Sequence, residues 1–166
     1  MPSTTTDNES KMPHPTLTKI IGKPNCLSLQ LIKTEMLANA RSVHSDEGDG
    51  RLGHARLVLS HIDYIANSTN SIAFIPHRKP APVVHSLNAT HETIYRSDKT
   101  NDREHAVWTT YRDTGDILKH QLLEALDNSF TKALKDATWG YSHRTIVEIL
   151  AHLDIYGEIT AKDLLN

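Results

Sequence analysis

A single cysteine, Cys26, occurs among the 166 residues of this chain, which excludes a disulfide core and every zinc motif that needs several cysteines. No apolar run approaches the roughly 18 residues that cross a membrane, and the N-terminus lacks the apolar segment of a signal peptide. These absences predict an intracellular, cytoplasmic protein with no membrane partner.

Motifs for catalysis and cofactor binding are also scarce. Neither His-Glu-x-x-His, Gly-x-Ser-x-Gly nor a Gly-x-x-x-x-Gly-Lys phosphate loop occurs, and the eleven histidines are scattered. We therefore expect no catalytic residue, no metal, no cofactor and no small-molecule substrate. A hydrolase assembled from distant positions stays open, and it would need a deep pocket that brings a histidine and a carboxylate within hydrogen-bonding distance.

The chain also has no strongly basic or acidic balance. It carries 18 Lys and Arg against 20 Asp and Glu, and its densest basic pair, Arg78-Lys79, is too small for a nucleic-acid-binding patch. Hydrophobic residues make up 38% of the chain, so part of it is expected outside the core. We assign residues 1–24, rich in Ser, Thr and Pro, to a disordered tail, and residues 25–166 to one helical domain.

Beyond the tail, apolar residues recur three or four positions apart, which is typical of helices that bury one face. The clearest segments are 28–41, 90–112, 115–137 and 145–156. With shorter segments they predict an all-α, multi-helix globular domain of five or more helices. The predicted core residues are Leu118, Leu122, Leu126, Phe130, Ile149, Leu150 and Leu153.

Helix starts and stops divide these segments. Thr145 and Glu148 have the spacing of a capping box, and Gly157 is expected to end the helix that begins there. Thr160 resembles the N-cap of a further short helix.

The part of the chain between residues 51 and 84 is harder to interpret. Residues 51–59 could form a strand or a short buried helix, and the helical surroundings favour the helix. Ser60 is a suitable N-cap for a helix over residues 61–67. Three prolines within residues 74–84 impose an extended loop, which is either a recognition loop or, as we favour, a rigid connector.

Large aromatic residues provide candidates for an interface. Trp108 and Tyr111 lie near the end of the long polar helix expected over residues 90–113. Tryptophan serves either a core or an interface, and both alternatives stand. We take Trp108 and Tyr111, with Leu57 and Tyr64 as further candidates, as residues that could contact another copy of the chain.

Two ordered series of residues carry a family resemblance. They are Gly53-His54-x-x-Leu57-Val58-Leu59-Ser60-x-x-x-Tyr64 and Ile149-Leu150-x-His152-Leu153-x-x-Tyr156-Gly157-x-Ile159-Thr160. Shorter matches are the loop with Phe74, Pro76 and Pro80, then Leu118-x-x-Gln121-Leu122 and Leu134-x-Asp136. Over residues 17–166 the chain resembles the Gag-like capsid proteins of copia-type long-terminal-repeat retrotransposons, in the branch common in diatoms and other unicellular algae.

The resemblance implies a capsid N-terminal-domain-like fold and a homo-oligomer that self-assembles through helix packing into a particle around the element's RNA. Gag proteins of this kind usually continue into a second helical domain, and often into a basic or Cys/His tail. This sequence lacks both, so we expect RNA to bind only through segments absent from this chain, and the chain to be a fragment or truncated copy. The alternative is a non-enzymatic helical binding or adaptor module, such as a domesticated Gag remnant, that recognises a protein partner.

Overall fold

The computed structural model describes residues 9–165, with only the backbone described at residues 159–164. Four α-helices lie within this part of the chain, and no strand occurs in it beyond an isolated bridge between Asp136 and Gly140. The all-α prediction is confirmed, but the predicted count of five or more helices is not met. The helices are α2 (Cys26–Ser42), α3 (His61–Asn67), α4 (His91–Glu124) and α5 (Ile146–Leu165).

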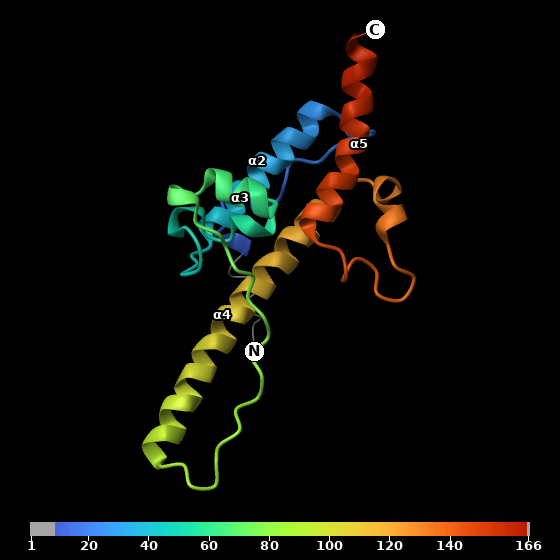
Figure 1. Cartoon of the computed structure of the whole chain (residues 1–166). Coiled ribbons are helices and arrows are strands. Elements are labelled where there is room, and N and C mark those ends of the chain that lie inside the picture. The colour runs from blue at the N-terminus through green and yellow to red at the C-terminus, as the bar shows by residue number, and fades with distance from the viewer. Residues whose placement is uncertain (1–8, 166) are drawn as a thin grey trace.

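The helices form an elongated molecule rather than a sphere (Figure 1). Helix α2 lies antiparallel to α5, since Cys26 is close to Gly157 while Lys33 contacts Asp154. The second half of α4 packs against the same α2. The first half of α4 projects from this body, and the C-terminal part of α5 extends in the opposite direction.

Helix α4 is one continuous helix of 34 residues where the sequence predicted two. It starts after Thr90, whose side chain accepts the backbone N–H of Thr93, and it passes through Gly115 without a break. A glycine costs a helix about 1 kcal/mol relative to alanine, but Gly115 does not interrupt this one, and the side chain of Leu57 lies at an ordinary van der Waals distance, 3.5 Å, from where a Cβ would stand.

The predicted helix over residues 115–137 ends early, at Glu124. Residues beyond it form two short 3₁₀ turns, Asn128–Phe130 and Lys132–Leu134. The carboxylate of Asp127 accepts the backbone N–H of Ser129 at 2.9 Å, and this local bond competes with continuation of the α-helix. The apolar spacing after residue 126 therefore does not continue the helix.

Residues 51–59 form no strand, in line with the favoured alternative, but they are not the single short helix that was expected either. They form two 3₁₀ turns, Gly50–Leu52 and Ala55–Leu57, separated by Gly53 at a φ of 49°. A Cβ on Gly53 would stand 2.6 Å from the carbonyl oxygen of Val43, so the chain passes the end of α2 where only glycine fits. The close approach and the positive φ together interrupt the helix.

The main core joins α2, the second half of α4 and the first half of α5. From α2 it takes Leu29, Ile32 and Met36. Six of the predicted core residues are buried and Phe130 is partly buried against them. The six are Leu118, Leu122, Leu126, Ile149, Leu150 and Leu153.

The segment before α2 packs on this core instead of forming a disordered tail. Met12 and Leu17 are buried in it. The side chain of Asn39 accepts the backbone N–H of His14 at 2.8 Å and donates to its carbonyl oxygen at 2.7 Å, while Gln121 donates to the carbonyl oxygen of Pro15 at 3.1 Å. The prediction of a disordered tail is therefore wrong over residues 9–24, and its first eight residues lie outside the described part of the chain.

Gly157 does not end α5, which continues to Leu165. A Cβ at Gly157 would lie 3.3 Å from the side chain of Leu29, so its small size serves the contact between α5 and α2. The segment from Thr160 is accordingly a continuation of α5 and not a new helix. No described helix is long and apolar enough to cross a membrane.

Leu122 offers a direct test of this core. It is fully buried, so Leu122→Ala is expected to lower the free energy of unfolding by about 3 kcal/mol, and Leu122→Asp to unfold the domain. Thermal and urea unfolding followed by circular dichroism measures both changes. Leu27→Ala is the control, because this leucine is 77% exposed and its replacement should change stability little. Equal stability of Leu122→Asp and the unaltered chain would contradict the assigned core.

Candidate interaction site

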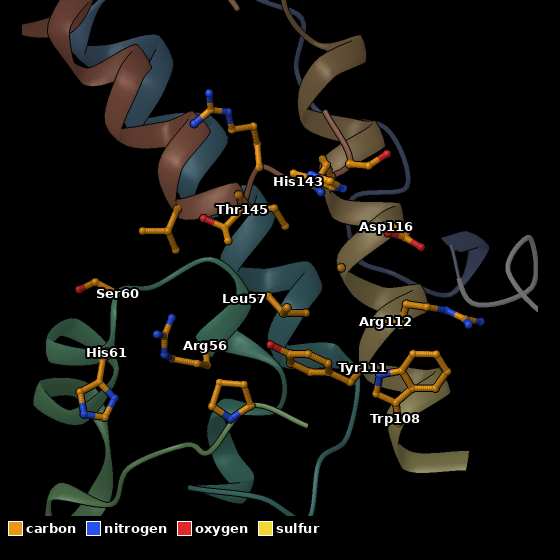
Figure 2. Close-up of a pocket in the computed structure, with 17 residues that line it drawn as sticks. Arg56, Leu57, Ser60, His61, Trp108, Tyr111, Arg112, Asp116, His143 and Thr145 are labelled. Carbon is orange, nitrogen blue, oxygen red and sulfur yellow. The ribbon is translucent and has the colours of Figure 1, made fainter. Parts of the chain in front are cut away.

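A groove of about 620 Å³ lies between α4 and the segment that leads into α3. Figure 2 shows Arg56, Leu57, Ser60 and His61 on one side, and the α4 residues on the other. The start of α5 closes one end of the groove. The α4 residues that line it are Trp108, Tyr111, Arg112, Gly115, Asp116 and Lys119.

Three of the four candidate interface residues meet at this groove. The ring of Tyr111 lies toward Leu57 in Figure 2, and both side chains are partly buried. Behind the groove, Tyr111 stacks on Phe74 with ring centroids 6.0 Å apart. Leu57 and Tyr111 therefore act as the apolar floor of the groove and also contact the core.

Tyr64 does not belong to the site, and its assignment as an interface residue is wrong. Its side chain is fully buried, and its hydroxyl oxygen accepts the backbone N–H of Asp49 at 2.9 Å. The cap at Ser60 places α3 so that Tyr64 faces inward, edge-on to Phe74. A residue held in this way cannot contact another chain.

Trp108 supports two cations on its indole ring. The guanidinium of Arg112 lies 4.7 Å from the ring centroid, and Nζ of Lys79 lies 5.7 Å from it. Such cation–π contacts hold a charged group over the negative face of the ring. Arg112 also contacts the neighbouring Asp113 at 3.0 Å, so its charge is partly compensated.

The charge that faces the groove is mainly positive. Its lining includes four Lys and Arg side chains against one carboxylate, that of Asp116. Arg144 lies 3.6 Å from Glu148, whereas Arg56 and Lys119 form no ion pair with a carboxylate among the described side chains, although Asp116 and Glu148 act on Lys119 from a longer distance. The four cationic residues are Arg56, Arg112, Lys119 and Arg144.

These two unpaired cations are held by backbone oxygens. Nη1 of Arg56 donates to the carbonyl oxygen of Leu59 at 2.8 Å, and Nζ of Lys119 donates to that of Tyr141 at 3.2 Å. Burial lowers the pKa of Lys119, because the ammonium is partly removed from water. The Nε atom of Arg56 is buried and has no hydrogen-bond partner among the described residues.

The groove does not contain the constellation that a hydrolase would need. His61, His143 and Asp116 line it, but no hydrogen bond joins a histidine to a carboxylate there among the described side chains. A histidine–carboxylate contact does occur between His44 and Asp46, at 2.8 Å, where both side chains are exposed. Among the side chains that the structure describes, no three of His, Cys, Asp or Glu are placed to hold a metal ion.

One motif was missed by the sequence analysis. Gly48, Gly50 and Gly53 have the Gly-x-Gly-x-x-Gly spacing of a dinucleotide-binding loop. The loop follows a helix and leads into 3₁₀ turns, whereas the nucleotide fingerprint joins a strand to a helix. The carboxylate of Asp49 already accepts the backbone N–H groups of Thr69 and Arg51, at 2.7 Å and 3.1 Å, so the spacing serves an internal acidic turn.

These two backbone donors lower the pKa of Asp49 from 3.8 to about 2. They stabilise the ionised carboxylate in the folded state. The stability that Asp49 contributes is therefore present above its unfolded pKa and is lost as the pH falls from about 4 to about 2.

A buried histidine lies behind the groove and was also missed. His54 is buried beside Phe74 and Tyr111, and its Nδ1 atom lies 2.8 Å from the carbonyl oxygen of Val43. Burial lowers the pKa of His54 below the ordinary 6.5. The sequence offers only the Gly53-His54 pair of the resemblance as a signal for this role.

No family model, curated protein or solved structure matches this chain. The assignment of function therefore depends on the residues and contacts of the chain itself.

His54 makes stability depend on pH. Because the folded state holds its pKa below 6.5, the unfolded chain binds the proton first, and stability is lost as the pH falls below that value. We expect the free energy of unfolding to decrease as the pH falls through about 6.5 and below. Replacing His54 by Gln should flatten this dependence, while His61→Gln, at an exposed position, should leave it unchanged. Urea unfolding across the pH range tests this, and parallel curves for the three proteins would refute the assignment.

Proposed function

We propose that this chain is a structural, Gag-like capsid protomer of a retrotransposon, which self-assembles through helix packing. The observation that carries the proposal is a projecting element, here termed the arm, made of residues 78–106. It consists of the extended loop and the first half of α4 (Figure 1). The buried residues of α4 begin only at Thr114, so the arm lies outside the core.

The arm is held together as a unit. The side chain of Asn101 donates to the carbonyl oxygen of Ala81 at 3.1 Å, and Nε2 of His85 lies 2.9 Å from the carboxylate of Asp98. These contacts join the loop to the helix along their length. The arm helix extends for about 24 Å at the rise of an α-helix.

The arm also carries large apolar side chains that are mostly exposed, although Nζ of Lys99 lies 5.2 Å from the ring centroid of Tyr95. Val84 and Tyr95 are 91% and 62% exposed, and Leu87 is fully exposed. A projecting helix with few contacts of its own gains stability when its apolar residues are buried against another element. In a closed symmetric assembly, another copy of the chain provides that element at every position.

The resemblance to copia-type Gag proteins gives this assembly its biological setting, with a capsid N-terminal-domain-like protomer as the expected fold. The proposed protomer is non-enzymatic, uses no cofactor and acts inside the cell with copies of itself. Contacts with the element's RNA would come from segments outside this chain. Trp108, Tyr111 and Leu57 remain candidate interface residues at the base of the arm.

A helical binding module that does not polymerise is the second candidate function. The observation that favours it is the groove, which combines an apolar floor with cations that lack carboxylate partners. Such a surface suits a protein ligand more than a symmetric contact with a copy of itself.

Removing the apolar side chains of the arm should prevent assembly. Sedimentation at several concentrations, with electron microscopy of the products, should show self-association of the unaltered chain. A variant with Val84, Leu87 and Tyr95 replaced by Ser should stay monomeric with an unchanged melting temperature, because these side chains add nothing to the core. An interface of ordinary size buries about 800 Å² on each partner, so three large side chains are a substantial share.

Ile62→Ser is the matched control, since this residue is 78% exposed on α3, away from the arm. It should assemble as the unaltered chain does. A constant monomer for the unaltered chain would refute the capsid proposal and favour the binding module. Equal assembly of the arm variant would show that the interface lies elsewhere.

A further inference from the structure

We propose that the groove between α4 and the segment 55–61 binds an acidic peptide segment of a partner protein, with carboxylates on either side of a leucine-sized side chain. Leu57 and Tyr111 form an apolar floor on which such a side chain can pack. Arg56 and Lys119 line the same groove without a carboxylate partner in the described chain. This binding does not depend on whether the chain assembles.

Lys119 is the first observation behind the proposal. Its ammonium is partly buried, which lowers its pKa, and its hydrogen bond goes to the neutral carbonyl oxygen of Tyr141. Removing an ammonium from water is unfavourable unless an opposite charge compensates. Asp116 and Glu148 favour the ammonium from beyond ion-pair distance but do not outweigh its burial, so a ligand carboxylate at Nζ would add a close opposite charge.

Arg56 is the second observation, and it comes from the opposite side of the groove (Figure 2). Its Nη1 atom is used by the carbonyl oxygen of Leu59, whereas its Nε atom is buried with no hydrogen-bond partner in the described chain. The Nε atom is not open to the groove, so a ligand carboxylate has to approach the guanidinium at its other N–H groups. Arg56 and Lys119 thus provide one positive charge on each side of the groove for two ligand carboxylates.

The groove favours a peptide over a nucleic acid for two reasons. Single-stranded nucleic acid is held by bases stacked on aromatic rings and by a continuous basic track. The ring of Trp108 already carries Arg112 and Lys79. Arg112 is paired with Asp113 and Arg144 with Glu148, so the basic positions do not form a continuous track for phosphates, whereas two separate peptide carboxylates need only Arg56 and Lys119.

Fluorescence anisotropy with a labelled peptide of alternating aspartate and leucine tests the proposal on the full chain. We expect saturable binding that weakens with added salt. Arg56→Gln and Lys119→Gln should each weaken binding about tenfold, and Lys132→Gln, an exposed lysine away from the groove, should not. Circular dichroism tests whether each variant is folded. If Arg56→Gln does not fold, the binding measured for Lys119→Gln tests the proposal.

Charge specificity is measured with two further probes and one more variant. An otherwise identical peptide with asparagine for aspartate should bind at least about tenfold more weakly, and Lys119→Glu should instead prefer a lysine–leucine peptide. Equal binding of the asparagine peptide, or no binding of the acidic one, would overturn the proposal. Tighter binding of labelled oligouridylate would assign the groove to nucleic acid instead. The variant with Val84, Leu87 and Tyr95 replaced by Ser should bind the acidic peptide as the unaltered chain does. Loss of assembly is therefore distinguished from loss of peptide binding.

Discussion

The packing of α2 against both of its long neighbours is the constraint on which the rest of the structure depends. The side chains of Leu29, Ile32 and Met36 are buried between α4 and α5. Two glycines allow other parts of the backbone to approach α2 closely. Gly157 allows α5 to lie against the start of α2, and Gly53 allows the next segment to pass its end. The N-terminal segment also packs on α2, where the side chain of Asn39 forms two hydrogen bonds with the backbone of His14.

Helix α2 is too short to cover the whole of α4. This difference in length leaves part of α4 exposed for contacts with other molecules. Helix α2 has 17 residues and α4 has 34, so only the second half of α4 meets the core. The first half is left as the arm, supported by the proline-containing loop instead of by another helix. At the point where α4 leaves the core, its side chains line the groove rather than a helix–helix contact.

Local chemistry in the sequence was a good guide where one residue determines the outcome. Ser60 caps α3 and Thr90 caps α4, and the structure places both helices within a residue of their predicted starts. It was a poor guide at Gly157, which was expected to end α5 but lies inside that helix, where a Cβ would stand 3.3 Å from the side chain of Leu29.

Such contacts join residues far apart in the chain, and periodicity does not report them. The groove was not predicted for the same reason. Arg56 and Lys119 are separated by more than sixty positions, and neither lies in a motif. Only the aromatic candidates Trp108 and Tyr111 indicated that this part of α4 has a role beyond its own helix. Core positions such as Leu122 were predictable because they repeat along one helix face, which the sequence alone displays.

Trp108 connects the two surfaces physically. Lys79, at the base of the arm, and Arg112, beside the groove, both rest on its ring. The proposed ligand carboxylates bind at Arg56 and Lys119 and not at Arg112, so a peptide in the groove leaves the contacts on this ring in place. One indole ring therefore borders both surfaces without making either proposed interaction depend on the other, and variants of the arm and of the groove can be studied separately.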